Sequence, residues 1–304
     1  MRRAILAVVL VLAVAGCGGG GGGDPSATTK DAASGPPLRI GTKNFPEEFL
    51  LGELYSQALR ANGFKVELKR DVGSTEIIHE ALTGGALDMY PEYVGVLLSE
   101  VANQPAQGAG PAEAYARAKM FEERRGFTLL AMTPFSDSNA LAVTPGFARR
   151  RNVHSIADLR DLPGRVRIGA PPEFATRFEG LVGLRQVYGV RNARATPLTI
   201  GAQYKALDRG RVDAAAVFTT DGQLAEGRYV LLEDPRKVFG TQHVAPVISR
   251  RALRSHGPRL RAVIDAVSRR LSASAMRRMN AQVQLRGREP RVVAAEFLKS
   301  SGLT

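Results

Sequence analysis

The sequence predicts a two-lobed α/β fold, in which each lobe is a mixed sheet flanked by helices and two strands connect the lobes. Three observations lead to this prediction. Short apolar strands and amphipathic helices alternate in β-α-β-α-β order from residue 38 to residue 89. The same order recurs in the second half of the 304-residue chain, and two extended segments rich in small apolar residues join the halves. Such alternation is typical of parallel sheets with right-handed crossovers.

The first half of the chain supplies the elements of one lobe. Residues 38–45 (LRIGTKNF) form a short β run that ends in polar residues. Residues 47–63 carry apolar side chains at helical spacing and end in a glycine, which is placed as a C-terminal cap. The remaining elements expected in this half are a strand over 64–68, a helix over 76–82 and a strand over 87–89.

A repeated frame indicates that the second lobe is built like the first. The frame Ala-Leu-x-x-Gly-x-(Leu/Val)-Asp occurs at residues 81–88 and 206–213, 125 positions apart. An Arg-Ile-Gly triplet occurs at residues 39–41 and 167–169, 128 positions apart. The alternative explanation is chance, because helix–turn–strand sequences of this kind are common in α/β proteins. In each frame the glycine follows a helix and the aspartate lies at the edge of a strand, so we expect both aspartates to be structural.

Two extended segments are expected to connect the lobes, SNALAVTP from residue 138 and QHVAPVIS from residue 242. If the chain crosses at the first and returns at the second, the amphipathic helices that follow must complete the first lobe. The predicted first lobe is residues 38–139 with 246–304, and the predicted second lobe is residues 140–245. Because ligands of α/β sheets bind at the carboxyl ends of strands, the cleft between the lobes is the predicted site.

The N-terminus has the layout of a bacterial export signal. Two arginines precede an apolar run from Ala4 to Ala15, which is too short to span a bilayer comfortably. The residues before Cys17 resemble a lipobox, which predicts a lipoprotein signal peptide over residues 1–16 and a lipid on Cys17. A plain secretory peptide or a buried cysteine is the alternative. Residues 17–37, rich in Gly, Ser and Pro, are predicted to be a flexible tether that holds the protein on the outer face of the cell membrane.

The charge of the chain is strongly basic. The formal net charge is +13 at pH 7, which would ordinarily suggest nucleic acid or another anionic surface as a partner. The arginines are scattered over helix faces and loops, without the aromatic interleaving of a single-strand platform or a groove-reading motif. We therefore expect no nucleic-acid binding and interpret the charge as a solvated surface that faces anionic lipid.

Motifs for catalysis, metals and cofactors are missing from the sequence. The four histidines show no metal-ligand spacing, and the chain has neither a Gly-x-Ser-x-Gly elbow nor a phosphate-binding loop. Its single cysteine cannot form a disulfide within the chain. We therefore expect a binding protein with no enzymatic activity, no cofactor and no metal.

Four segments occur in one order along the chain: IGTKNFPEEFLLGE, VGSTEIIHEAL, GALDMYPEYVG and VFTTDGQL. They are similar to the substrate-binding subunits of the ABC importers that take up glycine betaine, choline and related osmoprotectants. The resemblance runs from about residue 38 to the C-terminus. It implies a type II periplasmic-binding-protein-like fold, and a monomeric receptor that delivers a small solute to an ABC permease with its ATPase.

The resemblance also implies the site. Family members enclose a trimethylammonium head, which has no N–H to donate, in a box of tyrosine rings that attract it by cation–π interaction. Tyr93 matches a ring of this box, Lys43 matches a basic residue near the ligand carboxylate, and Arg177 matches a clamp arginine of the second lobe. The predicted ligand-binding residues are Lys43, Asn44, Tyr93, Asn139, Arg177, Phe218, Thr219 and His243.

Several positions depart from the family pattern. Asn139 stands where an aromatic residue is usual, Val96 replaces a hydroxyl residue, and Gln242-His243 replaces a pair of tyrosines. Phe218 retains one ring. A box with two rings in place of four is expected to hold a bare cation weakly. Two alternatives stay open: a receptor for an amino acid or another polar metabolite, and an exported enzyme or envelope structural protein on the same scaffold.

Overall fold

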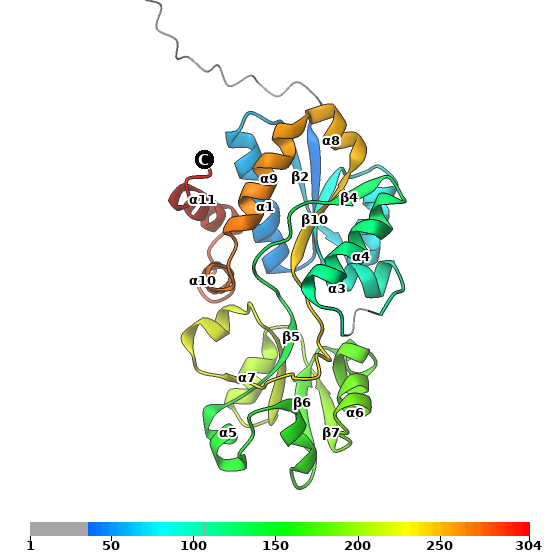
Figure 1. The fold of residues 1–304 in the computed structure, drawn as a ribbon. Coiled ribbons are helices and arrows are strands. Elements are labelled where there is room, and N and C mark those ends of the chain that lie inside the picture. The colour runs from blue at the N-terminus through cyan, green and yellow to red at the C-terminus, as the bar shows by residue number, and fades with distance from the viewer. Residues whose placement is uncertain (1–35, 106–107) are drawn as a thin grey trace, which may run out of the picture. The chain divides into compact units, whose positions relative to one another are not determined.

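Two five-stranded sheets organise the residues that this computed structural model describes, which are 36–105 and 108–304. The predicted signal peptide, the lipidation site Cys17 and the tether up to residue 35 lie outside the described residues. Figure 1 shows the first sheet in blue and cyan with β4 in green and β10 in orange, and the second sheet in green and yellow.

The first lobe is built on a sheet with strand order β2-β1-β3-β10-β4. β1 is parallel to β2 and β3, whereas β10, from much later in the chain, is antiparallel to β3 and β4. The sheet is therefore mixed. Its strands are β1 (Leu38–Lys43), β2 (Val66–Gly73), β3 (Met89–Tyr93), β4 (Phe127–Leu129) and β10 (Val244–Ser249).

The second lobe repeats this arrangement in the order β7-β6-β8-β5-β9. β6 is parallel to β7 and β8, and β5 is antiparallel to β8 and β9. Each sheet thus receives one antiparallel strand next to its parallel core. The strands are β5 (Asn139–Val143), β6 (Val166–Ala170), β7 (Ala193–Pro197), β8 (Ala214–Phe218) and β9 (Val230–Leu231).

The repeated sequence frame forms a clamp between a helix end and a strand. In the first lobe, the Arg39 guanidinium donates two hydrogen bonds to the Asp88 carboxylate at 2.9 and 2.8 Å. It donates a third to the Gly85 carbonyl at 2.7 Å. The backbone N–H of Asp88 donates to the Arg39 carbonyl at 2.8 Å, so that side chain and backbone both fix the start of β3.

The second lobe contains the same clamp. Arg167 donates to the Asp213 carboxylate at 3.0 and 2.9 Å and to the Gly210 carbonyl at 3.1 Å. Gly85 and Gly210 have φ of 76° and 65°, the left-handed conformation in which glycine is favoured. The two aspartates are therefore structural, and the repeated sequence frame corresponds to the same turn in each lobe.

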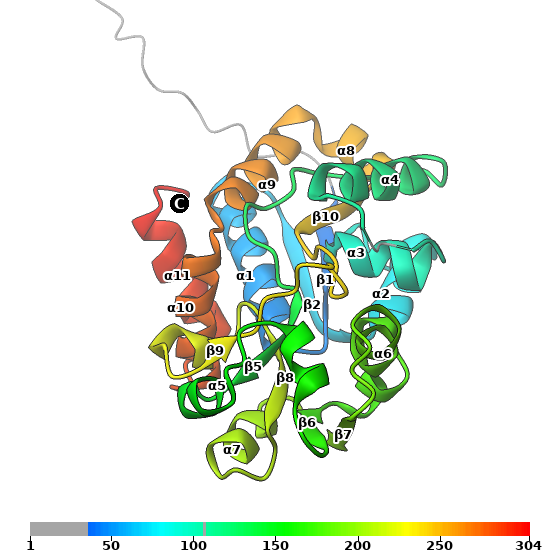
Figure 2. The same ribbon diagram turned by 60° about the horizontal axis from the view of Figure 1, so that its bottom comes forward.

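Helices cover both faces of the first sheet. On one face, α1 packs with α9, α10 and α11 over the buried side chains of Leu38, Ile40 and Met89. On the other face, α2, η1 and α4 cover Tyr90, because successive residues of a strand point to opposite faces. Figure 2 shows α1, α9, α10 and α11 together on one side of this lobe. The helices before the crossing are α1 (Pro46–Ala61), α2 (Thr75–Thr83), α3 (Val94–Val96), η1 (Leu97–Val101) and α4 (Pro111–Glu123).

The C-terminal part of the chain completes the first lobe, as expected from its amphipathic pattern. Its helices are α8 (Arg250–His256), α9 (Pro258–Arg270), α10 (Ala273–Gln284) and α11 (Pro290–Ser300). The second lobe carries shorter helices around its own core. They are α5 (Pro145–Arg151), η2 (Ile156–Asp161), η3 (Pro172–Ala175), η4 (Phe178–Val182), α6 (Gly183–Val187), α7 (Ala202–Asp208) and η5 (Gly222–Glu226).

Two short segments connect the sheets, residues 136–138 and residues 242–243. They are hydrogen-bonded to each other: the Asp137 N–H donates to the Gln242 carbonyl at 3.0 Å, and the Gln242 N–H donates to Ser136 Oγ at 2.9 Å. The hinge is therefore a pair of connecting segments joined by these bonds and by an isolated antiparallel bridge between Ser136 and His243.

The predicted lobe boundaries need correction by one or two residues. Asn139, predicted to end the first lobe, begins β5 of the second sheet, where it pairs with Phe218. Val244 and Ala245, predicted to end the second lobe, lie in β10 of the first sheet, where Val244 pairs with Tyr93. Backbone pairing decides which lobe these residues join, and the composition of the extended segments carries no information about that pairing.

Candidate functional site

A cavity of about 630 Å³ lies between the two lobes and is lined by residues from both. The first lobe contributes residues that follow β1 and β3 and residues at the starts of α1 and α2. The second lobe contributes residues that follow β6 and β8. These are carboxyl ends of strands in both sheets, which is where ligands of α/β folds collect.

Six of the eight predicted ligand-binding residues are among the described residues that line this cavity. They are Lys43, Asn44, Tyr93, Asn139, Arg177 and Phe218. The prediction thus brings together residues that lie up to 175 positions apart in the sequence, from Lys43 to Phe218.

Thr219 and His243 lie outside the described lining of the cavity. The Thr219 hydroxyl donates to the Ser136 carbonyl at 2.9 Å, and His243 Nδ1 lies 2.9 Å from the Thr133 carbonyl oxygen. Both side chains therefore brace the connecting segments. The next residue, Thr220, faces the cavity instead.

Lys43 is a buried, paired cation. Its Nζ lies 2.5 Å from Glu92 Oε1 and 4.4 Å from the centre of the Tyr93 ring. The side chain is 5% exposed. Because the Glu92 carboxylate already compensates its charge, Lys43 is poorly placed to neutralise the carboxylate of a ligand.

Arg177 is the cation that the cavity leaves available. It is exposed and lines the cavity at the residue before η4. Among the described residues, its guanidinium makes no hydrogen bond or ion pair that would occupy it. A planar guanidinium binds carboxylates in two-pronged fashion, so Arg177 fits the predicted role of a clamp.

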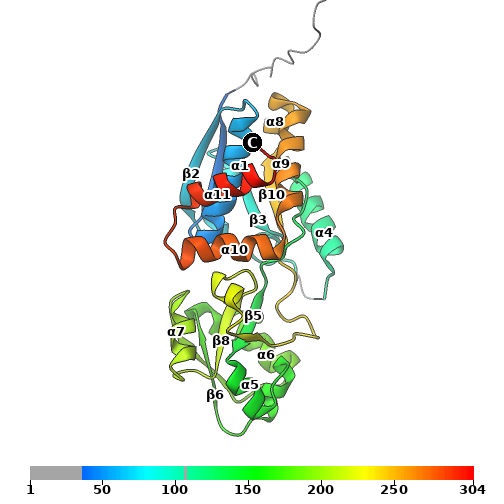
Figure 3. The same cartoon turned by 90° about the vertical axis from the view of Figure 1, so that its left-hand side faces the viewer.

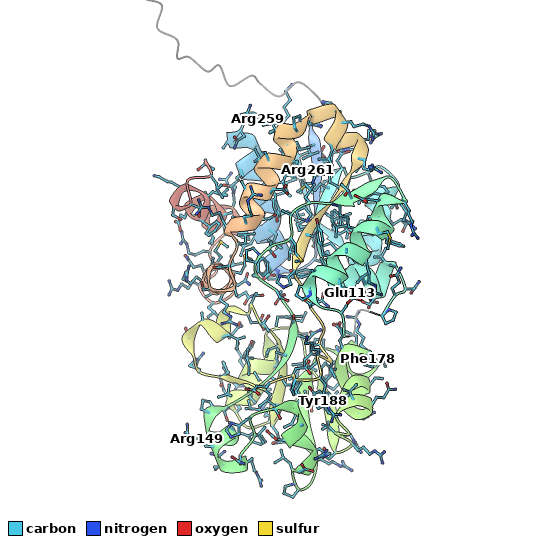
Figure 4. The ribbon with its side chains drawn as sticks, viewed as in Figure 1. Glu113, Arg149, Phe178, Tyr188, Arg259 and Arg261 are labelled. Atoms are coloured by element: carbon cyan, nitrogen blue, oxygen red, sulfur yellow. The ribbon has the colours of Figure 1, made fainter. Side chains whose placement is uncertain are left out.

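The cavity has more aromatic rings than the sequence predicted. In addition to Tyr93 and Phe218, three phenylalanines line it: Phe45, Phe174 and Phe178. Figure 4 shows Phe178 at the border of the second lobe. The cavity wall therefore holds five aromatic residues where the sequence led us to expect two rings: Phe45 follows β1, and Phe174 and Phe178 follow β6.

Carboxyl groups dominate the charge of the cavity. Seven acidic residues line it, against two cations, Lys43 and Arg177. The chain as a whole has a formal net charge of +13, so the acidic lining is a local departure from a basic protein. The acidic residues are Glu47, Glu76, Glu100, Asp137, Glu173, Glu179 and Asp221.

A group of buried polar side chains connects the two lobes at the cavity. Thr220 Oγ1 lies 2.6 Å from Glu47 Oε2 and 2.5 Å from Asp137 Oδ1. Tyr93 and Asn280 also donate to Glu47, at 2.8 and 2.6 Å. Because a hydroxyl donates one hydrogen, one of the two carboxyl groups must carry a proton in this arrangement. Burial raises the pKa of both Glu47 and Asp137, which agrees with a shared proton.

Glu179 is a second, half-buried carboxyl group of the cavity. Its oxygens accept hydrogen bonds from Asn139 at 3.1 Å and from Gln242 at 3.3 Å. Burial raises the pKa of Glu179 to about 7, although these two hydrogen bonds act in the opposite direction. Asn139 and Gln242, the residues that replace family aromatics, are therefore partners of a carboxyl group that titrates near neutral pH.

Sequence reasoning missed the carboxyl groups and the three phenylalanines. Glu47 and Asp221 lie inside the motifs that carry the family resemblance, FPEEF and TTDG, and that position is the signal that could have found them. Phe174 and Phe178 flank Arg177 in APPEFATRFEG, close enough in sequence to be considered with it.

The described residues provide no group of three or more His, Cys, Asp or Glu side chains that could hold a metal ion. Over the same residues, none of the helices is long and apolar enough to cross a membrane. The groups that the cavity offers a ligand thus include aromatic rings, carboxyl groups, amides and one available guanidinium.

Two similar lobes, a paired hinge and a cavity between the lobes with aromatic and acidic residues in its walls define the class of this protein, a two-lobed solute-binding protein. The chain belongs to the OpuAC family, the substrate binding domain of ABC-type glycine betaine transport systems, whose profile matches residues 36–300. The family resemblance seen in the sequence is therefore confirmed.

Known relatives extend over most of the chain. A glycine-betaine-binding protein of Pseudomonas aeruginosa is 31% identical over 277 residues, which cover 88% of each chain. The crystal structure of a glycine betaine/carnitine/choline ABC transporter is 26% identical, with a TM-score of 0.78 over 88% of this chain and 99% of that chain. Apo YehZ from Escherichia coli is 27% identical, with a TM-score of 0.73 over 89% of this chain and all of that chain. The predicted two-lobed fold class is confirmed by these structures.

Proposed function

We propose that this protein captures a small cationic or zwitterionic amine of the betaine and choline type in its cleft. It delivers the solute to an ABC permease and its ATPase and performs no bond chemistry. The observation that carries the proposal is the lining of the cavity, in which five aromatic rings and seven carboxyl groups stand against one paired and one available cation.

This lining suits a quaternary ammonium head. Such a head cannot donate a hydrogen bond from nitrogen, but it is attracted to ring faces by about 0.5–2 kcal/mol per well-placed ring. Carboxylates around the cavity add a field that favours any cation. If the solute is zwitterionic, Arg177 receives its carboxylate. The relatives, which are named for glycine betaine, carnitine and choline, support the same class of solute.

The N-terminal sequence also suggests where the protein resides. We infer an extracytoplasmic, monomeric receptor that is attached to the membrane by a lipid on Cys17, because the residues before Cys17 resemble a lipobox. Incorporation of labelled fatty acid into the wild-type chain and its loss in Cys17→Ser would test the attachment.

Isothermal titration with glycine betaine, choline, carnitine and proline betaine tests the proposed solute class. We expect at least one of them to bind, and Tyr93→Leu to weaken that binding by about 2- to 30-fold, the share of one ring. Tyr93→Phe keeps the ring and is the matched control, expected to lose less affinity than Tyr93→Leu. No measurable binding of any of the four solutes would contradict the solute class.

An amino acid or another polar metabolite is the second candidate. The hydrogen-bonded group of Asn139, Glu179 and Gln242 favours it, because these side chains present polar atoms where the family has rings. The same titration distinguishes the candidates: an amino acid that binds more tightly than every quaternary amine, with affinity unchanged by Tyr93→Leu, would favour the second.

A further inference from the structure

Two amide oxygens of the cavity have no hydrogen-bond partner among the described residues. They are Gln203 Oε1, from the first turn of α7 in the second lobe, and Asn280 Oδ1, from α10 in the first lobe. Both residues line the cavity and each is 1% exposed. A buried acceptor left without a donor weakens whichever state contains it.

The orientation of Asn280 is fixed by its neighbours. Its Nδ2 donates to Glu47 Oε2 at 2.6 Å and to the Thr220 carbonyl at 2.9 Å. Turning the amide over would bring its oxygen against the Thr220 carbonyl, which can only accept a hydrogen bond. Asn280 Oδ1 is therefore an acceptor by necessity, and it faces away from both partners of the amide nitrogen.

Gln203 lines the same cavity from the second lobe. The next residue of α7, Tyr204, donates to Asp221 Oδ2 at 2.8 Å, and Asp221 directly follows Thr220, whose carbonyl accepts from Asn280. The Thr220–Asp221 loop is thus bonded to the Asn280 amide nitrogen and to the residue that follows Gln203. The amide of Gln242, by contrast, is satisfied, since its oxygen accepts from the Val96 N–H at 3.0 Å and its nitrogen donates to Glu179.

We propose that the solute of this cleft carries a hydrogen-bond donor, a hydroxyl or an N–H group, in addition to its cationic head. Gln203 Oε1 is the principal acceptor of that donor, and Asn280 Oδ1 is a second acceptor in the lining of the same cavity. The inference rests on the proposed function and narrows it. Glycine betaine has only methyl groups and a carboxylate, so it cannot satisfy either oxygen, whereas a hydroxylated or N–H-bearing amine can.

Matched pairs of solutes isolate the donor. L-carnitine and γ-butyrobetaine differ by one hydroxyl group. In the O-methyl ether of choline, a methyl group replaces the hydroxyl hydrogen. We expect the donor-bearing member to bind residues 32–304 about ten-fold more tightly or better in at least one pair. Residues 32–304 group as one compact unit, and two solved relatives are matched over 99% and 100% of their chains, so this part can be tested by itself.

A pair of glutamine variants assigns the donor to its acceptor. Gln203→Met keeps the length of the side chain and removes the acceptor, so we expect the preference for the donor-bearing solute to fall at least three-fold. Gln223→Met is the control, because Gln223 Oε1 is also buried without a partner but does not belong to the described cavity lining. It is expected to keep the preference of the wild-type protein.

The titrations separate the donor inference, its assignment to Gln203 and the proposed function. Equal affinity within both pairs, or tighter binding of the methyl ether and γ-butyrobetaine, overturns the donor inference while the proposed function stands. An unchanged preference in Gln203→Met overturns the assignment to Gln203. No binding of any of the four solutes, nor of glycine betaine or proline betaine, overturns the proposed function and the inference together.

Discussion

At the scale of single residues, the sequence predicted which side chains line the cleft better than it predicted which of them are already paired. Lys43 and Arg177 both line the cavity, yet Lys43 is neutralised by Glu92 at 2.5 Å and Arg177 remains available. Asn139 lines it as predicted but donates to Glu179. A residue brings its functional group to the cleft, and its neighbours decide what that group can still do.

The position of Glu179 in the cavity predicts that solute affinity depends on pH. Burial raises its pKa to about 7, so the carboxyl group is mostly protonated at pH 6 and mostly ionised at pH 8. A cationic solute binds the ionised form better, and its affinity is therefore expected to rise with pH, by up to about ten-fold per pH unit below the pKa. Titration calorimetry at pH 6, 7 and 8 measures the change, together with the proton released on binding.

The control for this prediction is a cavity carboxylate that is exposed. Glu179→Gln should bind the cation with little dependence on pH over this range, and Glu173→Gln should behave like the wild-type protein, because Glu173 lies at the exposed edge of the cavity. A pH dependence that persists in Glu179→Gln would show that another group controls it.

At the scale of elements, α10 joins the two lobes. It packs on α1 and α11 of the first lobe and also contacts η5 of the second, and Figure 3 shows it beside the yellow segment that contains η5. The contact is close at Gly222, whose N–H donates to Gln284 Oε1 at 3.1 Å. A Cβ atom at this position would lie 2.5 Å from the Ala281 Cα. Only glycine lets the two elements approach this far.

Gly222→Ala is therefore expected to weaken closure of the lobes. The methyl group would push η5 away from the α10 backbone, and overpacking of this kind costs about 1–3 kcal/mol. If ligand binding requires the closed arrangement, the dissociation constant rises about ten-fold or more. Calorimetric titration of the variant measures this change, while each lobe keeps its own core.

Gly110→Ala is the matched control. Gly110 has an ordinary φ of −70°, and a Cβ atom there would meet nothing within 4 Å. Its affinity should equal that of the wild-type protein. An unchanged affinity in Gly222→Ala as well would mean that the contact between α10 and η5 does not take part in binding.

At the scale of the whole molecule, a buried acid and a buried histidine link stability to pH. Glu122 Oε1 lies 3.7 Å from His79 Nε2, and neither Glu122 oxygen has a hydrogen-bond partner among the described residues. Burial raises the pKa of Glu122 to about 7 and lowers the pKa of His79 to about 4. Both groups are therefore neutral in the folded protein near pH 6.

The sign of the effect follows from proton uptake. Between the unfolded and folded pKa of Glu122, roughly pH 4.5 to 7, the folded state holds a proton that the unfolded state lacks, so this group lowers stability as pH rises. His79 acts in the opposite direction between about pH 4 and 6.5. The two contributions offset each other in the wild-type protein, which should be nearly indifferent to pH at this site.

Glu122→Gln removes the contribution of Glu122 and leaves that of His79. Relative to the wild-type protein, the free energy of unfolding of the variant is expected to rise with pH by about 1 kcal/mol per pH unit between pH 5 and 6.5. Chemical denaturation at several pH values measures the difference. Glu123→Gln, at the next and exposed position, should run parallel to the wild-type curve, and a parallel curve for Glu122→Gln would refute the argument.

The sequence predicted the architecture well because architecture depends on patterns that are local. Strand and helix periods, glycine turns and the repeated Asp88 and Asp213 frames all lie within short windows. One strand was misplaced: it was expected over residues 87–89 and extends over Met89–Tyr93. Pro91 interrupts the strand pattern in the sequence, yet in the structure it pairs opposite Pro246 of β10, a partner that no local window contains.

By itself, the sequence determined the two-lobed fold, the family and six residues of the cleft, because apolar periodicity and motif order are properties of the chain. Only the tertiary structure decided the chemistry of the cleft. It brought Glu47, Asp137 and Thr220 together across the hinge, paired Lys43 with Glu92, added three phenylalanine rings and left the oxygens of Gln203 and Asn280 without donors. Charge state, pairing and exposure depend on distances between atoms that are far apart in sequence, and those distances exist only once the chain has folded.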